Sequence, residues 1–343
     1  MEEKVKSTAE ETAAQEAQKE KKLRAVRLLK DNNSVLILVV LLFIGLVLVD
    51  GFTTSFYNVF LYSSVYGIVC LGLALVMITG NIDLSLGYMA TFCGCSCVLT
   101  FNAVYAAMGS ELAGVILGLI VALLVGALLG CFNGFIITKC GVSPLIATIA
   151  TNYIYEGLVL KFASSSFSPT EKSMIQVVAK TKIFGLKWLT PMVIIFVLFI
   201  IGIFIWMRKT KFGNRLQVVG DNPEAAEFAG ISVKKTVWIT YVIAGVCAAV
   251  CGFMMVSYSG FAIYTQGVTL GTFPISCCVI GGIKMSGGKG TAVHVLLGVL
   301  IMRIISNIMS AMYWNTAWVN LATGIVLIVV LIVDRFTSTK SAD

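Results

Sequence analysis

The sequence is short of charge and of histidine. Charged residues make up 12% of the 343 residues, whereas a soluble domain carries about 25%. His294 is the single histidine, and neither Cys-X-X-Cys nor His-Glu-X-X-His occurs. These absences exclude a soluble enzyme-like core. They also argue against a zinc site and against an intramembrane enzyme with a nucleophile and a base.

A nucleotide-binding P-loop is missing as well. The motif needs Gly-X-X-X-X-Gly-Lys-Ser/Thr, so that backbone amides and the lysine hold phosphates. Around Gly288-Lys289, the nearest approach, Gly290 replaces the Ser/Thr and Ile283 replaces the first glycine. We therefore expect this chain to bind no cofactor, with ATP and Mg held by a separate polypeptide.

Long apolar runs dominate what is present. Hydrophobic residues make up 58% of the chain, and the mean hydropathy is +0.94. A bilayer core of ~30 Å takes about 20 helical residues, so the pattern predicts an all-α, polytopic membrane protein with about ten transmembrane helices. The short or glycine-interrupted third and eighth runs are expected to be re-entrant or broken. The ten runs are 34–51, 57–79, 84–107, 112–137, 144–161, 189–207, 236–258, 269–282, 291–311 and 316–333.

Lysine and arginine set the predicted orientation and boundaries. Residues 1–33 form a polar tail with eight basic residues, which places it in the cytoplasm. No signal peptide is expected. The transmembrane domain is predicted over 34–335 and a cytoplasmic C-terminal tail over 336–343. The outside loop 162–188 is the exception to the charge rule, because it carries Lys172, Lys180, Lys182 and Lys187.

A weak internal repeat joins residues 77–87 and 279–288. Each segment is a glycine-rich break between apolar runs, and the two begin on spans of opposite direction. This pattern predicts a five-plus-five inverted repeat with a transport path at the breaks. Ordinary interfacial turns are the alternative, and Asn or Thr within spans can instead bond neighbouring helices. The candidate path residues are Asn81, Asp83, Ser85, Gly87, Asn133, Thr148, Asn152, Glu156, Gly281, Gly282, Ser286 and Gly287.

Three further features lie within the spans. Glu156 is a costly intramembrane carboxylate, which either serves function or pairs with Arg303 of the ninth span. Pro274 is expected to break a helix in the eighth run. The ten cysteines lie almost entirely in or at the ends of apolar runs, where cysteine acts as a small hydrophobe.

A short helix is predicted at 222–230, in a polar connector on the cytoplasmic side. Asn222 can cap its N-terminus, Pro223 fits the first turn, and Glu224 suits the positive end of the helix dipole. Gly230 can take the left-handed position that ends the helix. Its apolar residues outside lipid favour contact with a partner protein. These residues are Ala225, Ala226, Phe228 and Ala229.

Four segments carry a family resemblance that runs in order over residues 57–335. They are Gly80-Asn81-Ile82-Asp83-Leu84-Ser85-Leu86-Gly87; Asn133-Gly134 with 143–148; Gly213-Asn214-Arg215 with 220–234; and Gly281-Gly282 with 286–290. Together they resemble the permease subunits of the ribose and simple-sugar ABC importer family.

The resemblance implies a multi-pass protein of the bacterial cytoplasmic membrane that imports a monosaccharide such as ribose. It implies that Asn222, Glu224, Ala225, Ala226, Phe228 and Gly230 form the coupling helix that docks on an ABC ATPase subunit. An extracytoplasmic solute-binding protein and a second permease copy, identical or related, would complete the assembly, with lipid around it and no nucleic acid. An ion-coupled secondary transporter and a scaffold subunit that binds no cargo remain the alternatives.

Overall fold

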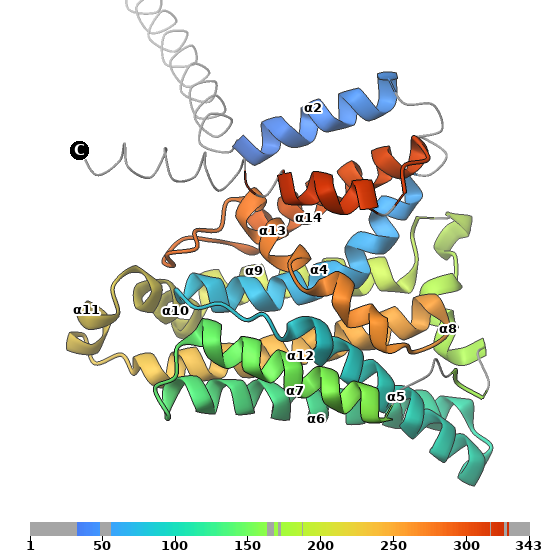
Figure 1. Ribbon diagram of the computed structural model, residues 1–343, viewed down its shortest axis with the longest axis horizontal. Coiled ribbons are helices and arrows are strands. Elements are labelled where there is room, and N and C mark those ends of the chain that lie inside the picture. The colour runs from blue at the N-terminus through green and yellow to red at the C-terminus, as the bar shows by residue number, and fades with distance from the viewer. Residues whose placement is uncertain are drawn as a thin grey trace, which may run out of the picture.

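The computed structural model describes residues 33–48, 56–162, 168–170, 173–186, 188–315, 317–325 and 328. The N-terminal tail up to residue 32 and the C-terminal tail from residue 336 lie outside these residues, so both tail predictions stay untested. Helices make up the ordered elements of the described part (Figure 1). They are α2 (Asn33–Leu48), α4 (Tyr57–Ile78), α5 (Leu86–Met108), α6 (Glu111–Thr138), α7 (Pro144–Phe162), α8 (Ser173–Lys180), η1 (Ile183–Gly185), α9 (Pro191–Lys209), α10 (Lys211–Asp221), α11 (Pro223–Phe228), α12 (Val233–Ser259), η2 (Tyr264–Leu270), α13 (Phe273–Gly281) and α14 (Ala292–Ala311).

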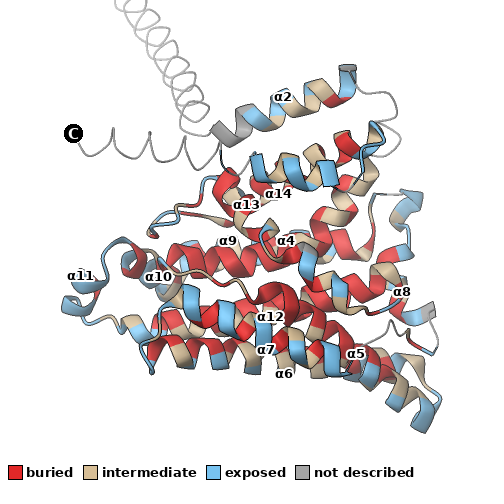
Figure 2. Cartoon of the chain, in the orientation of Figure 1, coloured by how far each residue is buried: buried red, intermediate tan, exposed pale blue. Residues whose placement is uncertain are grey.

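Helices α4 and α12 form the buried centre of the bundle, with α5 and α6 packed along α12 (Figure 2). Small residues allow this packing. A Cβ atom added at Gly126 would overlap the carbonyl oxygen of Gly245, and one added at Gly130 would overlap that of Tyr241. The glycine stripe of α6 therefore brings its backbone directly against α12.

Six of the described helices are long and apolar enough to cross a membrane: α4, α5, α6, α9, α12 and α14. Helix α2 is also apolar but shorter, and α7 covers the predicted fifth run without meeting the same criterion. Residues 317–325 are helical, and the rest of the predicted tenth run is described only at residue 328. The count of ten spans and the inverted repeat therefore stay predictions.

The two interrupted runs differ from each other. The eighth run is broken as predicted, because η2 ends at Leu270 and α13 is only nine residues long. The third run was wrongly expected to be broken, because α5 is a continuous helix of 23 residues. Its glycine-rich break, 79–85, precedes the helix instead. Pro274 was wrongly expected to interrupt a helix, since it occupies the first turn of α13, where no backbone N–H partner is needed.

Candidate coupling element and transport path

The short cytoplasmic helix predicted from sequence is α11, and its caps form as expected. The Asn222 side chain accepts a hydrogen bond of 2.9 Å from the Ala225 N–H. Pro223 opens the helix, and Glu224 lies in its first turn. Gly230 has φ +75°, and the Ile231 N–H closes the turn on the Ala226 carbonyl at 2.9 Å. Local sequence alone thus fixes both ends of this element.

One face of α11 is open to solvent. Phe228 is 94% exposed, whereas Ala226 is fully buried against the rest of the chain. Glu224 and Ala225 are exposed beside Phe228. An exposed ring on a small, capped helix is a suitable anchor for a pocket on another protein.

Helix α10 joins this element to the membrane bundle, and we had not singled it out from sequence. Its last turn carries Gly220, which is buried. A Cβ atom at Gly220 would overlap the Ile78 carbonyl oxygen and lie 2.6 Å from the Gly288 nitrogen. The backbone of α10 is therefore wedged between the end of α4 and the turn 283–290.

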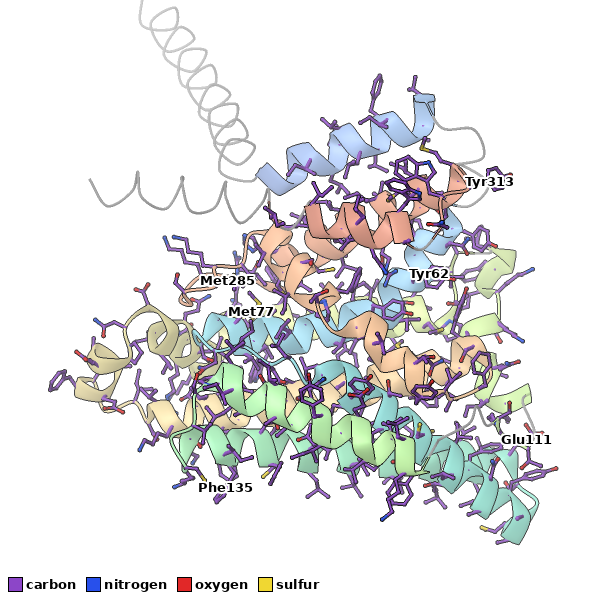
Figure 3. The ribbon with its side chains drawn as sticks, in the orientation of Figure 1. Tyr62, Met77, Glu111, Phe135, Met285 and Tyr313 are labelled. Carbon is purple, nitrogen blue, oxygen red and sulfur yellow. The ribbon has the colours of Figure 1, made fainter. Side chains whose placement is uncertain are left out.

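The two glycine-rich breaks of the repeat meet at this place. The Gly288 N–H donates to the Ile78 carbonyl at 2.9 Å. Gly287 has φ +90°, and a Cβ atom there would lie 2.7 Å from the Gly80 nitrogen and from the Gly220 oxygen. Figure 3 labels Met77 and Met285, which lie on the two segments that come together. We call this contact of Gly80, Gly220, Gly287 and Gly288 the glycine junction.

A cavity of about 550 Å³ opens beside the glycine junction. Asn81 and Ser286, two predicted path residues, contribute to its wall, together with Asp221 from α10. Cys140 also lines it and is the exposed member of the ten free cysteines. Polar groups from both breaks therefore face one water-accessible space next to α11.

Three other predicted path residues form a buried polar network at the start of α5. The Ser85 N–H and hydroxyl both donate to Asp83 Oδ1, at 2.9 and 2.7 Å. Asn133 Nδ2 donates to Ser85 Oγ at 2.8 Å and to Asp83 Oδ2 at 3.3 Å. Tyr155, which sequence reasoning missed, donates to Asn133 Oδ1 at 2.8 Å. The network ties the break 79–85 to α6 and α7.

The network is buried, so each of its polar groups needs a hydrogen-bond partner within the protein. Asp83 is 2% exposed, and Ser85 and Asn133 are fully buried. Each donor used here satisfies an acceptor that would otherwise be costly to bury. Tyr241 of α12 adds a further link, because its hydroxyl donates to the Ile82 carbonyl at 2.9 Å. The break is thus anchored to three helices through Ile82, Asp83 and Ser85, while Gly80 and Asn81 line the water-accessible cavity.

The remaining path candidates lie apart from this network. Thr148 donates to the Pro144 carbonyl of its own helix at 2.8 Å. Asn152 is half-buried on α7, and Gly282 is exposed at the end of α13. Gly87 and Gly281 are packing positions, the first against the Gly267 carbonyl oxygen and the second against that of His294. The structure therefore brings together only part of the predicted set.

Glu156 does not pair with Arg303, which corrects the structural alternative drawn from sequence. Glu156 Oε1 accepts a hydrogen bond of 2.7 Å from the Tyr88 hydroxyl. The Arg303 guanidinium instead lies 4.2 Å from the ring centres of both Tyr66 and Phe273. Aromatic faces stabilise a desolvated cation, so no carboxylate is required there.

Replacing Glu156 with glutamine tests whether its charge has a function. The amide oxygen of Glu156→Gln can still accept the Tyr88 hydrogen bond, so we expect thermal stability to change by less than about 1 kcal/mol and uptake to stay within about twofold. Uptake in vesicles and thermal unfolding of the purified chain measure both. Loss of uptake at unchanged stability would assign the charge to transport.

Comparisons with known proteins match the chain to transport permeases. Residues 55–331 match the family described as branched-chain amino acid transport system / permease component. The autoinducer 2 import system permease protein LsrC of Yersinia pestis (strain Pestoides F) is 28% identical over 283 residues, covering 82% of this chain and 77% of that protein. The probable ABC transporter permease protein y4mJ of Sinorhizobium fredii is 28% identical over 273 residues, with 80% and 79% covered.

No solved structure matches the chain. The family match nevertheless spans the six described helices that are long and apolar enough to cross a membrane, the glycine junction and α11. The chain therefore belongs to the branched-chain amino acid transport system / permease component family.

Proposed function

We propose that this permease component forms the translocation path of a binding-protein-dependent ABC importer for a small polar solute, a monosaccharide such as ribose. The chain itself is not an enzyme, and ATP hydrolysis belongs to a separate ATPase subunit. It is a multi-pass protein of the inner membrane. We further propose that its N-terminus is cytoplasmic, that an extracytoplasmic binding protein delivers the solute, and that a second permease copy completes the path.

The single observation that carries this proposal is the connection from α11 to the glycine junction. Phe228 is 94% exposed on α11. Helix α10 directly precedes α11 in the chain, and its Gly220 lies against Ile78 and Gly288. A displacement of α11 by a partner would therefore press on both glycine-rich breaks at once.

The mechanism follows from that connection. Closure of the ATPase dimer moves α11, and the backbone contacts at the junction transmit the movement because close-packed atoms have low compressibility. The break 79–85 and the turn 283–290 then shift relative to the bundle, and access to the path alternates. ATP drives this cycle only if the partner binds α11 more tightly in one of the two states.

Truncation of the exposed ring tests the docking role. Phe228→Ala is expected to weaken ATPase docking by roughly 30-fold, the cost of removing an aromatic anchor at ~2 kcal/mol. Uptake and solute-stimulated ATPase activity of the reconstituted importer should fall in parallel, while the chain still inserts. Glu224→Lys and Gly230→Val should act in the same direction.

Phe184→Ala is the matched control, because Phe184 is 90% exposed but lies in η1, at the opposite end of the bundle (Figure 1). It should leave ATPase docking unchanged. Photo-cross-linking from position 228 in cells should capture an ATPase subunit. Normal uptake by Phe228→Ala would count against the coupling role.

An ion-coupled secondary transporter is the second candidate, favoured only by the buried carboxylate of Asp83. Uptake into vesicles with a proton or sodium gradient and no ATP would identify it. Binding of candidate sugars to the purified complex would separate a transporting subunit from a scaffold subunit.

A further inference from the structure

A second cavity, of about 460 Å³, lies at the end of the bundle opposite to α11. Its described lining comes from α4, α8, the segment after α8, α9 and α12. The lining residues are Tyr57, Asn58, Leu61, Ala179, Lys180, Lys182, Thr190 and Tyr258. This is the region where the outside loop broke the charge rule for membrane proteins.

Two long helices direct their N-termini to this cavity. Tyr57 and Asn58 are the first two residues of α4, and Thr190 is the N-cap of α9. The N-terminus of a helix carries a partial positive charge and unpaired backbone N–H groups, which favour anions. The N-termini of α4 and α9 therefore both contribute a positive electrostatic potential to the cavity.

The side chains add charge of that same sign. Lys180 and Lys182 line the cavity, and none of its described lining residues is acidic. Lys180 Nζ donates to Gln176 Oε1, which holds the ammonium in place without neutralising it. Both lysines are exposed, so both ammonium groups stay charged at the mouth of the cavity and give it a positive potential that attracts anions.

A buried hydroxyl also lacks a partner here. Thr190 is 2% exposed, yet its Oγ1 makes no cap hydrogen bond and has no partner among the described residues. A buried polar atom without a partner is unfavourable. Rotation of the Thr190 side chain would turn Oγ1 into the cavity, where it could donate to a ligand oxygen.

A further cation lies deeper in the bundle behind the same wall. The Tyr258 hydroxyl donates to the Tyr62 hydroxyl at 3.1 Å, and Tyr62, labelled in Figure 3, lies 5.6 Å from the Arg303 guanidinium. Arg303 Nε is buried without a hydrogen-bond partner in the described part of the chain. The Arg303 guanidinium is therefore a further positive group, and Tyr62 and Tyr258 lie between it and the cavity.

We infer that this cavity is an entry site for an anionic solute, a small polyol or sugar that carries one carboxylate or phosphate group. Lys180 and Lys182 bind the anionic group together with the N-termini of α4 and α9, and the Thr190 hydroxyl turns into the cavity and donates to it. The inference rests on the proposed import function, but it assigns the solute an anionic group, which the neutral example ribose lacks.

Equilibrium binding to the purified full-length chain in phosphatidylcholine nanodiscs tests the site. The probes are ribose, ribonate, ribose 5-phosphate and inorganic phosphate. We expect ribonate or ribose 5-phosphate to bind, and Lys182→Gln to weaken binding about tenfold, as for loss of one charge-assisted hydrogen bond. Lys180→Gln should act similarly, and affinity should fall between about 0.01 and 0.15 M salt, as the Debye length shortens.

Lys161→Gln is the control, because Lys161 is an exposed lysine in the last turn of α7 that does not line the cavity. It should bind as the natural chain does. The inference would be overturned if neutral ribose bound as tightly as ribonate or ribose 5-phosphate. It would also be overturned if Lys180→Gln and Lys182→Gln left the affinity for the anions unchanged. Neither result would contradict the proposed import function. Absence of binding by every probe would overturn the inference too.

Lipid is the other source of the same phosphate chemistry. If phosphatidylglycerol in the nanodisc raises the unfolding temperature through Lys180 and Lys182 while no soluble anion does, the cavity is a lipid site and the solute assignment is wrong. Failure of the import function would instead appear as absent ATP-dependent uptake in the Phe228 experiment, so the two results are distinguishable.

Discussion

Gly220→Val is expected to abolish uptake and to lower the stability of the chain. The Cβ atom of any larger residue at this position would overlap the Ile78 carbonyl oxygen and approach the Gly288 nitrogen to 2.6 Å. Both are backbone atoms, which cannot turn aside as a flexible side chain can. Overpacking of this kind costs about 1–3 kcal/mol of stability. Loss of the coupling between α11 and the two breaks, typically worth about 1–3 kcal/mol, should lower uptake by roughly tenfold or more.

The matched control for this change is Gly202→Ala. Gly202 is also helical, in α9, and a Cβ atom there meets nothing within 4 Å in the described part of the chain. Uptake should be retained and stability unchanged or slightly raised. ATP-dependent uptake and thermal unfolding in detergent measure both variants. A fully active Gly220→Val chain would show that α10 does not transmit movement through the glycine junction.

Asn133→Asp is expected to have the other large effect, although it replaces only an amide with a carboxyl group. Asn133 Nδ2 is 3.3 Å from Asp83 Oδ2, and both residues are buried. Two carboxylates at that distance cannot both ionise cheaply. We expect a loss on the order of 3 kcal/mol at neutral pH, the cost of an uncompensated buried charge.

The sign of the pH dependence distinguishes repulsion from general misfolding. As the pH falls, one of the two carboxyl groups takes up a proton and can donate a hydrogen bond to the other, so stability relative to the natural chain should recover. Asn81→Asp is the control, because Asn81 lines a water-accessible cavity, and it should lose little. Thermal unfolding across pH would refute the role of this network if the loss did not diminish in acid.

The helical architecture and α11 could be predicted because their causes are local. The apolar runs set helix positions to within a few residues, and Asn222, Pro223 and Gly230 set the ends of α11 through backbone preferences. In each case neighbours in sequence decide the result.

The partners across the bundle could not be predicted in the same way. Glu156 has no local signal that would favour Tyr88 over Arg303, since the choice depends on which helices are adjacent. Tyr155 was missed because an aromatic residue in an apolar run is ordinarily a core residue, and only the fold places it beside Asn133. Gly220 belongs to one of the four segments that carry the family resemblance, but its contact with Gly288 is set by tertiary structure.

Cys140 offers a route to observing the proposed movement in an unmodified chain. Eight of the other nine cysteines are buried, and Cys131 is half-buried, whereas Cys140 is exposed at the rim of the cavity that also contains Asp221 and Ser286. A maleimide fluorophore or nitroxide would therefore attach preferentially at Cys140, beside the contact between α10 and the two glycine-rich breaks. Its emission or mobility would report the proposed movement of α10 relative to those breaks during each transport cycle.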